Sequence, residues 1–505
     1  MARRSRRREK PPFKQLPWRQ VVNRYPPIEP LDEEQIEQIH DASMKVIEEL
    51  GMVFLDEDAC ESLRKAGADT DKDTQLVRMD RDMVLEHVAK APAEFTLYAR
   101  NPAHNLRIGG NVINFSAVGS PPNCSDMDHG RRPGNFEDFR NLVRLVQSLN
   151  IVHMIGGHPV EPIDLPVETR HLDSVRVFVT DCDKVFSAYA LGRERISDAI
   201  DMACIVRGKT RDKIKSEPSF HTVINTNSPL KLDGPMLRGL KEAAEWGQCI
   251  VITPFTLAGA MSPVTLAGAL TQQNAEALMA IAYTQIVAPG TPTIYGGFTS
   301  NVDMKTGAPA FGTPEYTRAE LIGGQLARRY KLPYRSSNVN ASNCVDSQAT
   351  YESMMSIWGA VMGGCHMMKH AVGWLEGGLC ASFEKIIVDA EMLQTMAEFL
   401  EPISVDEDSI GIDAMRDVGP GGHFFGTAHT LERYETAFYE PMLSDWRNFE
   451  TWEETGSVTA ERRANKIFKA VLAEYQPPPM EATVREELDA FVEQRRREIT
   501  TIAAA

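Results

Sequence analysis

Residues that can bind a metal or attack a carbonyl gather in the stretch CHMMKHAVGW, residues 365–374. On a helix, His366 and His370 are four residues apart and could bind zinc together with Cys365. We expect a strand here, however, in which side chains alternate between the two faces, and the period is then wrong for that geometry. No HExxH motif supplies a further ligand. We therefore favour a histidine pair without a bound metal.

A nucleophile is equally hard to find. Lys369 is the one lysine at the end of a predicted strand, where a Schiff-base enzyme would need it, but its neighbour His370 would then point the other way. No GxSxG motif is present. Glu376 and Glu384 are the nearest carboxylates, and either could instead stabilise a helix N-terminus or pair with Lys385.

The stretch PYRSSNVNASNCVDSQATYE, residues 333–352, combines asparagines and serines where a buried strand is expected to lead into a helix. It contains no lysine or histidine, and no carboxylate before Asp346. If this is the edge of an active site, the reaction there uses neutral amides and hydroxyls.

The elements that position these residues alternate between short apolar strands and amphipathic helices. Strands that are apolar throughout are buried on both faces, which is typical of a parallel sheet. The pattern predicts a (β/α)₈ TIM barrel over residues 109–400, because no phosphate-binding glycine motif supports an open nucleotide-binding sheet. The predicted strands are NVINFSAV, IVHMIGGH, KVFSAYA, SFHTVINT, CIVITPF, PTIYGGF, LPYRSSN and CHMMKHAVGW.

Three further segments flank this barrel. Residues 1–30 begin with MARRSRRREK and predict a basic flexible arm, for which RNA or membrane binding is the less favoured alternative. Residues 31–108 predict an N-terminal helical segment, and residues 401–505 a C-terminal helical extension packed on the barrel.

Composition narrows the class of protein. The chain has 505 residues, 43% hydrophobic residues and a formal net charge of −16, which argues against nucleic acid as the main partner. Its eight cysteines form no CxxC motif, which favours reduced thiols in the cytoplasm. No apolar run reaches the ~18 residues that span a membrane. We expect a cytoplasmic homo-oligomer with no membrane or nucleic-acid partner.

The active site of such a barrel lies at the carboxyl ends of its strands. The residues expected at those ends are mostly aromatic or neutral and polar, and π faces attract a cation such as a quaternary ammonium, which has no N–H to donate. These residues are Phe115, Ser116, His158, Tyr189, Asn225, Asn227, Thr253, Phe255, Tyr295, Phe298, Asn338, Asn340, His370 and Trp374.

Several longer motifs resemble those of the trimethylamine methyltransferase family. The resemblance covers most of the chain. The motifs are NTNSPL (225–230), GAMSPVTLAGALTQQNAE (259–276), DSQATYE (346–352), GWLEGGLCASFEKIIVDAE (373–391) and VGPGGHFFGTAHT (418–430).

The resemblance implies a (β/α)₈ barrel that transfers a methyl group from a methylated amine to the Co(I) of a corrinoid (cobalamin) carried by a separate corrinoid protein. Founding members carry pyrrolysine at the exit of the seventh strand, which by alignment falls within 337–343. This chain has standard residues there and so resembles the pyrrolysine-lacking branch, whose characterised members demethylate quaternary amines such as glycine betaine.

Such chemistry explains why the sequence shows no nucleophile and no general acid. The cobalt is the nucleophile, and a departing neutral tertiary amine needs no proton. It implies no catalytic side chain and no metal bound by this chain. Arg335, His221 and His370 are candidate partners for a betaine carboxylate, although Arg335 could instead face the helices. The expected substrate-binding residues are Phe115, Tyr189, His221, Asn225, Asn227, Tyr295, Phe298, Arg335, Asn338, Asn340, His370, Trp374 and Glu376.

Alternative functions remain open at this point. The same chemistry could act on trimethylamine, carnitine, proline betaine or a sulfonium, because the shape of the pocket decides the substrate. A barrel of this kind could also bind a quaternary amine as a sensor without turning it over. A metal-dependent lyase or hydrolase built on Cys365, His366 and His370 is the third possibility.

Overall fold

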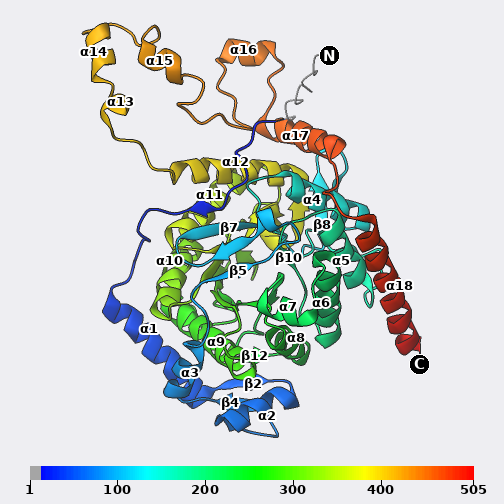
Figure 1. Cartoon of the computed structure of the whole chain (residues 1–505). Helices are drawn as coiled ribbons and strands as arrows, with labels where there is room; N and C mark the ends of the chain where they lie inside the picture. The colour runs from blue at the N-terminus through cyan, green and yellow to red at the C-terminus, as the bar shows by residue number, and fades with distance from the viewer. Residues whose placement is uncertain (1–12, 505) are drawn as a thin grey trace.

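A strongly curled sheet of eight strands forms the centre of the protein, and helices surround it (Figure 1). The computed structural model describes residues 13–504. The strand order is β1-β7-β19-β18-β15-β13-β11-β10, and every pairing is parallel except that of β1 with β7. The bounds are β1 (Val21–Val22), β7 (Val112–Ala117), β10 (Phe186–Ser187), β11 (Phe220–Ile224), β13 (Cys249–Ile252), β15 (Thr293–Gly296), β18 (Tyr334–Ser337) and β19 (Met367–Val372).

The two ends of the curled sheet approach each other through a single residue. Met154 makes parallel bridges to Ser116 in β7 and to Val185, which directly precedes β10. The strand predicted at 151–158 is therefore present only as this bridge, whereas the other predicted strands all form. Their apolar side chains are buried, as the pattern of the sequence indicates.

The helices that follow the strands pack around the sheet. Most begin at a polar residue whose side chain accepts a backbone N–H of the first turn; Asp346, for example, accepts the N–H of Ala349 at 3.0 Å. The bounds are α4 (Phe136–Ser148), α5 (Arg170–Thr180), α6 (Arg193–Arg207), α7 (Arg211–Ser216), α8 (Gly234–Glu245), α9 (Leu266–Val287), α10 (Pro314–Arg329), α11 (Ser347–Met362) and α12 (Phe383–Phe399).

Two small sheets lie beyond the carboxyl ends of the main strands, and the sequence analysis did not predict them. Their orders are β14-β16-β17 and β20-β21-β8-β9, and they carry Phe255, Phe298 and Trp374. The bounds are β8 (Asn123–Asp126), β9 (Gly130–Pro133), β14 (Phe255–Ala258), β16 (Phe298–Val302), β17 (Pro309–Ala310), β20 (Trp374–Leu375), the 3₁₀ turn η3 (Glu376–Gly378) and β21 (Cys380–Ser382).

The N-terminal segment is mixed rather than helical, which corrects the prediction for residues 31–108. Its strands pair as β12-β2-β4-β3, so they depend on β12 from a distant loop, and β5 pairs with β6. A local pattern cannot show such a pairing. The bounds are α1 (Glu33–Lys45), the π-helix η1 (Val46–Leu50), β2 (Met52–Phe54), α2 (Glu57–Ala66), β3 (Asp69–Thr70), β4 (Leu76–Arg78), α3 (Arg81–Val88), β5 (Phe95–Leu97), η2 (Pro102–His104), β6 (Leu106–Ile108) and β12 (Lys231–Leu232).

The arm predicted at residues 1–30 is only partly described. Residues 1–12 lie outside the described part of the chain. Residues 13–30 run along the protein body instead of forming a free arm: the Leu16 N–H donates to Gln394 Oε1 at 2.7 Å, and β1 pairs with β7.

The C-terminal extension is helical, but only its last two helices pack on the rest of the molecule, whereas the prediction had the whole extension packed there. α17 packs against α12 and α4, and α18 lies along α5 and α6, whereas α13 to α15 extend away from the rest of the molecule (Figure 1). Within residues 13–504, no helix has the length and apolarity to cross a membrane. The bounds are α13 (Glu407–Ile410), α14 (Ile412–Val418), α15 (Ala428–Arg433), α16 (Phe449–Glu454), α17 (Ala460–Glu474) and α18 (Ala482–Ala504).

A buried histidine at the base of the sheet gives the fold a pH dependence. His153 is fully buried; Nδ1 accepts the N–H of Phe115 at 2.9 Å and Nε2–H donates to the carbonyl of Arg19 at 2.8 Å. Burial lowers its pKa to about 3. The imidazole of an unfolded chain has a pKa of about 6.5. Below that pH the unfolded state binds a proton that the folded state does not, so this contribution is full above pH 6.5 and is lost as the pH falls towards 3.

We therefore expect His153 to lower the unfolding free energy by about 1.4 kcal/mol for each pH unit below 6.5. Urea unfolding of the wild type and of His153→Gln at pH 7 and pH 5.5 measures this. The unfolding free energy of the variant should fall less steeply with decreasing pH, by that amount, because glutamine does not titrate. Equal slopes in the two proteins would contradict the assignment.

Candidate active site

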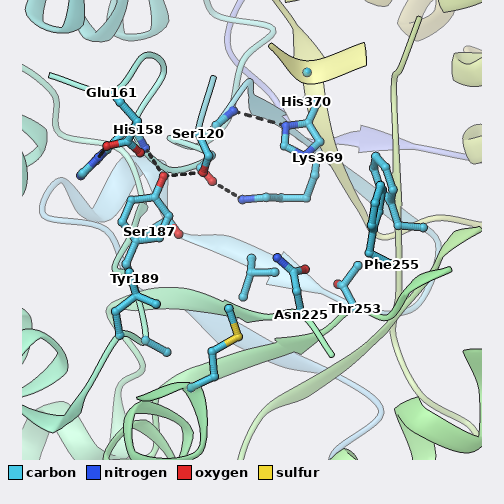
Figure 2. Close-up of a pocket in the computed structure, with 18 of the residues that line it drawn as sticks. Ser120, His158, Glu161, Ser187, Tyr189, Asn225, Thr253, Phe255, Lys369 and His370 are labelled. Atoms are coloured by element: carbon cyan, nitrogen blue, oxygen red, sulfur yellow. Dashed lines mark hydrogen bonds and ion pairs between the residues drawn. The ribbon is translucent and has the colours of Figure 1, made fainter. Parts of the chain in front are cut away.

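A cavity of about 590 Å³ opens at the carboxyl ends of the curled strands. Figure 2 shows Ser120, Tyr189, Asn225, Lys369 and Phe255 arranged around it. One side is aromatic and the other polar. Of the predicted substrate-binding residues, the structure places Tyr189, Asn225, Phe298, Arg335, His370 and Trp374 in the lining.

The aromatic wall is a continuous group of rings. Phe298 lies at its centre, with ring centroids 5.3 Å from Phe255, 5.4 Å from Phe311 and 6.0 Å from Trp374. His370 adds its imidazole 4.5 Å from Trp374. Burial, followed by the charges of Arg335 and Lys369, holds the pKa of His370 well below its usual value. The wall is therefore uncharged and suits a quaternary ammonium group.

The Gly-Gly pair after Trp374 is required by this packing. Gly378 has a φ of +99°, and a Cβ there would lie 2.5 Å from the indole ring of Trp374. A larger residue would displace the ring from the cavity.

Arg335 is one of three arginines that line the cavity, and it faces inward rather than towards the helices. It is 2% exposed and its guanidinium lies 5.1 Å from the centroid of Phe298. One nitrogen donates to the carbonyl of Gly297 at 3.0 Å, but Nε has no partner, and Arg335 forms no ion pair with any described residue. A buried guanidinium without a carboxylate is expensive, so the site is prepared for an anionic group of a ligand.

The carboxyl group nearest to Arg335 does not provide that anion. Glu320 is buried behind the strand and accepts a hydrogen bond from Ser336 Oγ at 2.6 Å. Burial raises the pKa of Glu320 well above its usual value, which favours its neutral acid form.

Lys369 and His370 both line the cavity although they are adjacent in the sequence. The register of β19 against β7 shifts between Met368 and Val372, and His370 has a φ of +55°. This bulge breaks the alternation of side chains. The expectation that Lys369 and His370 would point in opposite directions is therefore wrong, as Figure 2 shows.

The surroundings of Lys369 favour the neutral form of its amine. Its Nζ donates to the carbonyl of Gly156 and lies 3.0 Å from His221 Nε2. Burial, followed by the charge of Arg335, lowers the pKa of Lys369 well below its usual value. His221 thus lies behind Lys369 and outside the lining.

A hydrogen-bonded network forms the opposite, polar wall. Tyr189 Oη lies 2.6 Å from Ser120 Oγ and accepts the N–H of His158 at 3.0 Å, and His158 Nδ1 contacts Glu161 at 2.9 Å (Figure 2). Burial works to raise the pKa of Glu161, but the hydrogen bond from His158 and the charges of His158 and Arg170 outweigh it, so the net shift is downward. Glu161 therefore carries its charge here beside its own partners.

Four of the predicted residues support neighbouring segments instead of lining the cavity. Phe115 stacks on His153 with centroids 5.5 Å apart. Tyr295 donates to Asn274 Oδ1 at 3.1 Å. Asn227 accepts the N–H of Asp233 at 2.9 Å, which fixes the turn of the NTNSPL motif. Glu376 binds Arg131 Nε at 2.9 Å.

Asn338 and Asn340 also lie outside the lining, where they connect the exits of β18 and β19. Asn338 donates to the carbonyl of Ala371 at 3.0 Å, and Asn340 donates to the carbonyl of Trp374 at 2.6 Å. The carbonyl of Asn340 accepts the indole N–H of Trp374 at 3.1 Å. Their amides thus position the aromatic wall.

The three candidate metal ligands are not brought together. Cys365 and His366 precede β19, and His366 accepts the N–H of Tyr334 at 2.8 Å and lies 2.9 Å from the carbonyl of Gly110. His370 lies in the cavity lining. Among residues 13–504, no group of three or more His, Cys, Asp or Glu residues could hold a metal ion.

Several lining residues were absent from the predicted set. His158, Thr253 and Phe255 were among the residues expected at the strand ends, and this position in the sequence could have identified them as lining residues. Ser120, Glu161 and Phe311 lie in loops beyond the strands, where no periodic pattern marks them. The bulge that directs Lys369 into the cavity has no evident sequence signal.

Fold and site together define an α/β protein whose cavity, at the carboxyl ends of a curled parallel sheet, is chemically suited to a small cation that also carries an acidic group. The model of the family described as Trimethylamine methyltransferase (MTTB) matches residues 1–500. The chain belongs to this family and is a methyltransferase, as the sequence motifs predicted.

Similar proteins agree with this membership. Glycine betaine methyltransferase of Desulfitobacterium hafniense (strain Y51) is 37% identical over 470 residues, which cover 93% of this chain and 97% of that protein. Trimethylamine methyltransferase MttB of Desulfitobacterium hafniense (strain DSM 10664 / DCB-2) is 26% identical over 468 residues, covering 92% and 94%. A crystal structure of the hydroxylamine MtmB complex has 12% identity, a TM-score of 0.53 and coverage of 93% and 90%, which shows a shared fold.

Proposed function

We propose that this methyltransferase takes its methyl group from a quaternary amine that carries a carboxylate, with glycine betaine as the best single candidate, and delivers it to the Co(I) of a corrinoid protein. The observation that carries the proposal is the position of Arg335 beside the aromatic wall, a buried cation that has no ion-pair partner within residues 13–504. The relative named as a glycine betaine methyltransferase supports the same substrate.

The distance between the two recognition elements favours a short zwitterion. Phe298 is the central ring of the aromatic wall and also the ring on which the guanidinium of Arg335 lies, at 5.1 Å. A ligand bound at both elements thus has its ammonium and carboxylate within about one ring of each other. Glycine betaine has one methylene group between them, whereas carnitine has a longer spacer.

The side chains of the cavity then position the substrate and supply no proton. The C–N bond breaks with its electron pair remaining on nitrogen, so the departing tertiary amine is neutral and needs no general acid. Burial lowers the pKa of both His370 and Lys369 and so favours their neutral forms, and the wall puts no carboxylate beside the ammonium whose charge disappears in the transition state. When the partner protein is docked, its corrinoid supplies the nucleophilic Co(I).

The rim of the cavity fits a partner that presents a large, mostly apolar cofactor. Val167, Leu191 and Leu379 line the cavity and are also exposed to solvent. Exposed apolar residues around an opening are typical of a docking surface. We propose that these residues surround the approaching corrinoid and exclude water from the methyl group.

Two further features belong to this proposal. The curled sheet acts as a complete (β/α)₈ barrel closed through Met154, whose two bridges join β7 to the start of β10. The enzyme works in the cytoplasm, which is supported by its eight free cysteines.

A panel of methylated amines tests the function directly. The purified protein is mixed with Co(I) cobalamin or a corrinoid protein, and loss of the Co(I) absorption band reports methyl transfer. Glycine betaine should react fastest, ahead of carnitine and proline betaine, and far ahead of tetramethylammonium, which has no carboxylate. Faster transfer from trimethylamine or tetramethylammonium, or transfer at full rate without cobalt, would overturn the proposal.

The aromatic wall gives a separate prediction. Trp374→Leu keeps an apolar side chain but removes the π face, so glycine betaine should bind about 5- to 30-fold more weakly, equivalent to ~1–2 kcal/mol. Calorimetric titration with glycine betaine measures the loss. The control ligand is 3,3-dimethylbutanoate, in which carbon replaces the charged nitrogen, and its affinity should change much less. An equal loss for both ligands would mean that the indole acts only by packing.

A further inference from the structure

A long C-terminal segment has no core of its own. Residues 402–438, here called the arm, leave the end of α12 and extend away from the sheet (Figure 1). The arm contains α13, α14 and α15, but Ala414 is the one residue within it that is buried. Its large apolar side chains that face solvent are Ile403, Val405, Ile410, Ile412, Met415, Phe424, Phe425, Leu431, Tyr434 and Phe438.

An ordered segment of this kind needs a surface to pack on. Ordering the backbone costs conformational entropy, and burial of apolar side chains is the main term that offsets this cost. Phe425 and Phe438 are each 84% exposed. Such side chains contribute almost nothing to stability in the isolated chain, so the surface that buries them lies outside the arm.

A second exposed apolar surface lies on the body, at the base of the arm. Tyr351, Met355 and Trp358 follow one another at helical spacing on the outer face of α11. The ring of Trp358 lies 5.4 Å from that of Phe399 at the end of α12, and Phe399 stacks on Tyr25 at 5.4 Å. These five residues, here called the patch, form an exposed apolar surface.

We propose that the arm of one copy of this chain packs on the patch of a second copy, and that the two copies exchange arms reciprocally. The arm begins directly after Phe399, a patch residue, so a two-fold axis beside α12 would present each arm to the other patch. Reciprocal exchange buries the exposed apolar side chains of the arm and those of the patch in the same interface. Their content of Tyr, Trp, Phe and Met is typical of the buried centre of a lasting interface.

A second copy suits these surfaces better than the corrinoid protein does. The corrinoid protein has to leave after each methyl transfer, and an apolar rim around the cavity already offers it a place to dock. Packing of the arm on its own patch would need the arm to fold back over α11, whereas it extends outward (Figure 1).

Sedimentation velocity on the full chain tests the exchange. The wild type should have twice the 56.2 kDa mass of one chain. An arm variant, Phe425→Asp with Phe438→Asp, and a patch variant, Met355→Asp with Trp358→Asp, should each sediment as monomers. The control is Leu50→Asp, an exposed apolar residue of the N-terminal segment, which should leave the mass unchanged. Far-ultraviolet circular dichroism confirms that each variant is folded.

Mixing the two variants then tests the pairing itself. The arm variant keeps an intact patch and the patch variant keeps an intact arm, so one of the two contacts can form between them. Native mass spectrometry with one variant labelled by ¹⁵N should show the mixed dimer, which neither variant forms alone. A monomeric wild type, a dimer that both variants retain, or the absence of the mixed dimer would each overturn the proposal.

Discussion

Arg335→Met should weaken the binding of glycine betaine about 30-fold or more. The guanidinium is the buried cation that we expect to bind the carboxylate, and removing one member of a buried, hydrogen-bonded charge pair costs roughly 2–5 kcal/mol. The loss should appear as a raised KM for betaine in the Co(I) assay and as weaker binding in calorimetry. Arg335→Lys should lie between the wild type and Arg335→Met, because a lysine keeps the charge but cannot bind a carboxylate with two parallel hydrogen bonds.

Two controls separate recognition of the ligand from damage to the fold. Tetramethylammonium has no carboxylate, so the wild type and Arg335→Met should bind it equally. The melting temperature of ligand-free Arg335→Met should not fall, because the variant loses a buried cation that has no ion-pair partner among the described residues. Weakened binding of both ligands, or a lowered melting temperature, would show that Arg335 has a structural role instead.

Asp389→Asn should destabilise the fold by about 3–5 kcal/mol, the usual cost of breaking a buried ion pair. Lys385 and Asp389 form such a pair with both side chains fully buried. Asp389 also accepts the N–H of Gly373 at 2.8 Å, and Lys385 donates to Ser353 Oγ at 2.8 Å. Asparagine leaves the ammonium of Lys385 without its counter-charge, so the midpoint of urea unfolding should fall while the m-value stays constant.

A double substitution provides the matched comparison. Asp389→Leu combined with Lys385→Met removes both charges, and well-packed apolar residues often replace a buried pair at little cost. The double variant should therefore be more stable than Asp389→Asn. The backbone N–H of Gly373 would still lose its acceptor, so we expect partial recovery. A double variant no more stable than Asp389→Asn would show that the site depends on packing or on the Gly373 contact more than on charge.

Much of the curled parallel sheet was predictable because its strands are short, continuously apolar and bounded by glycine and proline. The strands at β7, β11, β13, β15, β18 and β19 form within their predicted ranges. The exception is the segment at 151–158, where Met154 alone makes the bridges. Helix starts were marked by capping residues such as Asp32, whose side chain accepts the N–H of Gln35 at 2.8 Å.

The N-terminal segment was predicted less well, because its strands have partners far away in the sequence. Val53 pairs with Lys231 in β12 and Val77 with Met52. Glu276 shows a similar connection between two motifs: it accepts hydrogen bonds from Ser228 Oγ at 2.6 Å and from the Leu230 N–H at 2.8 Å, and so holds the NTNSPL loop against α9. The sequence contains both motifs but does not show that they meet.

By itself, the sequence determined the family, the parallel α/β core and the neutral, aromatic character of the site, because these follow from residue types and their local periodicity. Only the tertiary structure decided which of those residues face the cavity. A bulge turns Lys369 and His370 to the same side, and Arg335 lies against Phe298 with no carboxylate partner among the described residues. From outside the lining, Asn340 supports Trp374 and Asn338 holds the carbonyl of Ala371. Orientations of this kind depend on strand register and on loops that approach from elsewhere in the chain, and no local pattern contains that information.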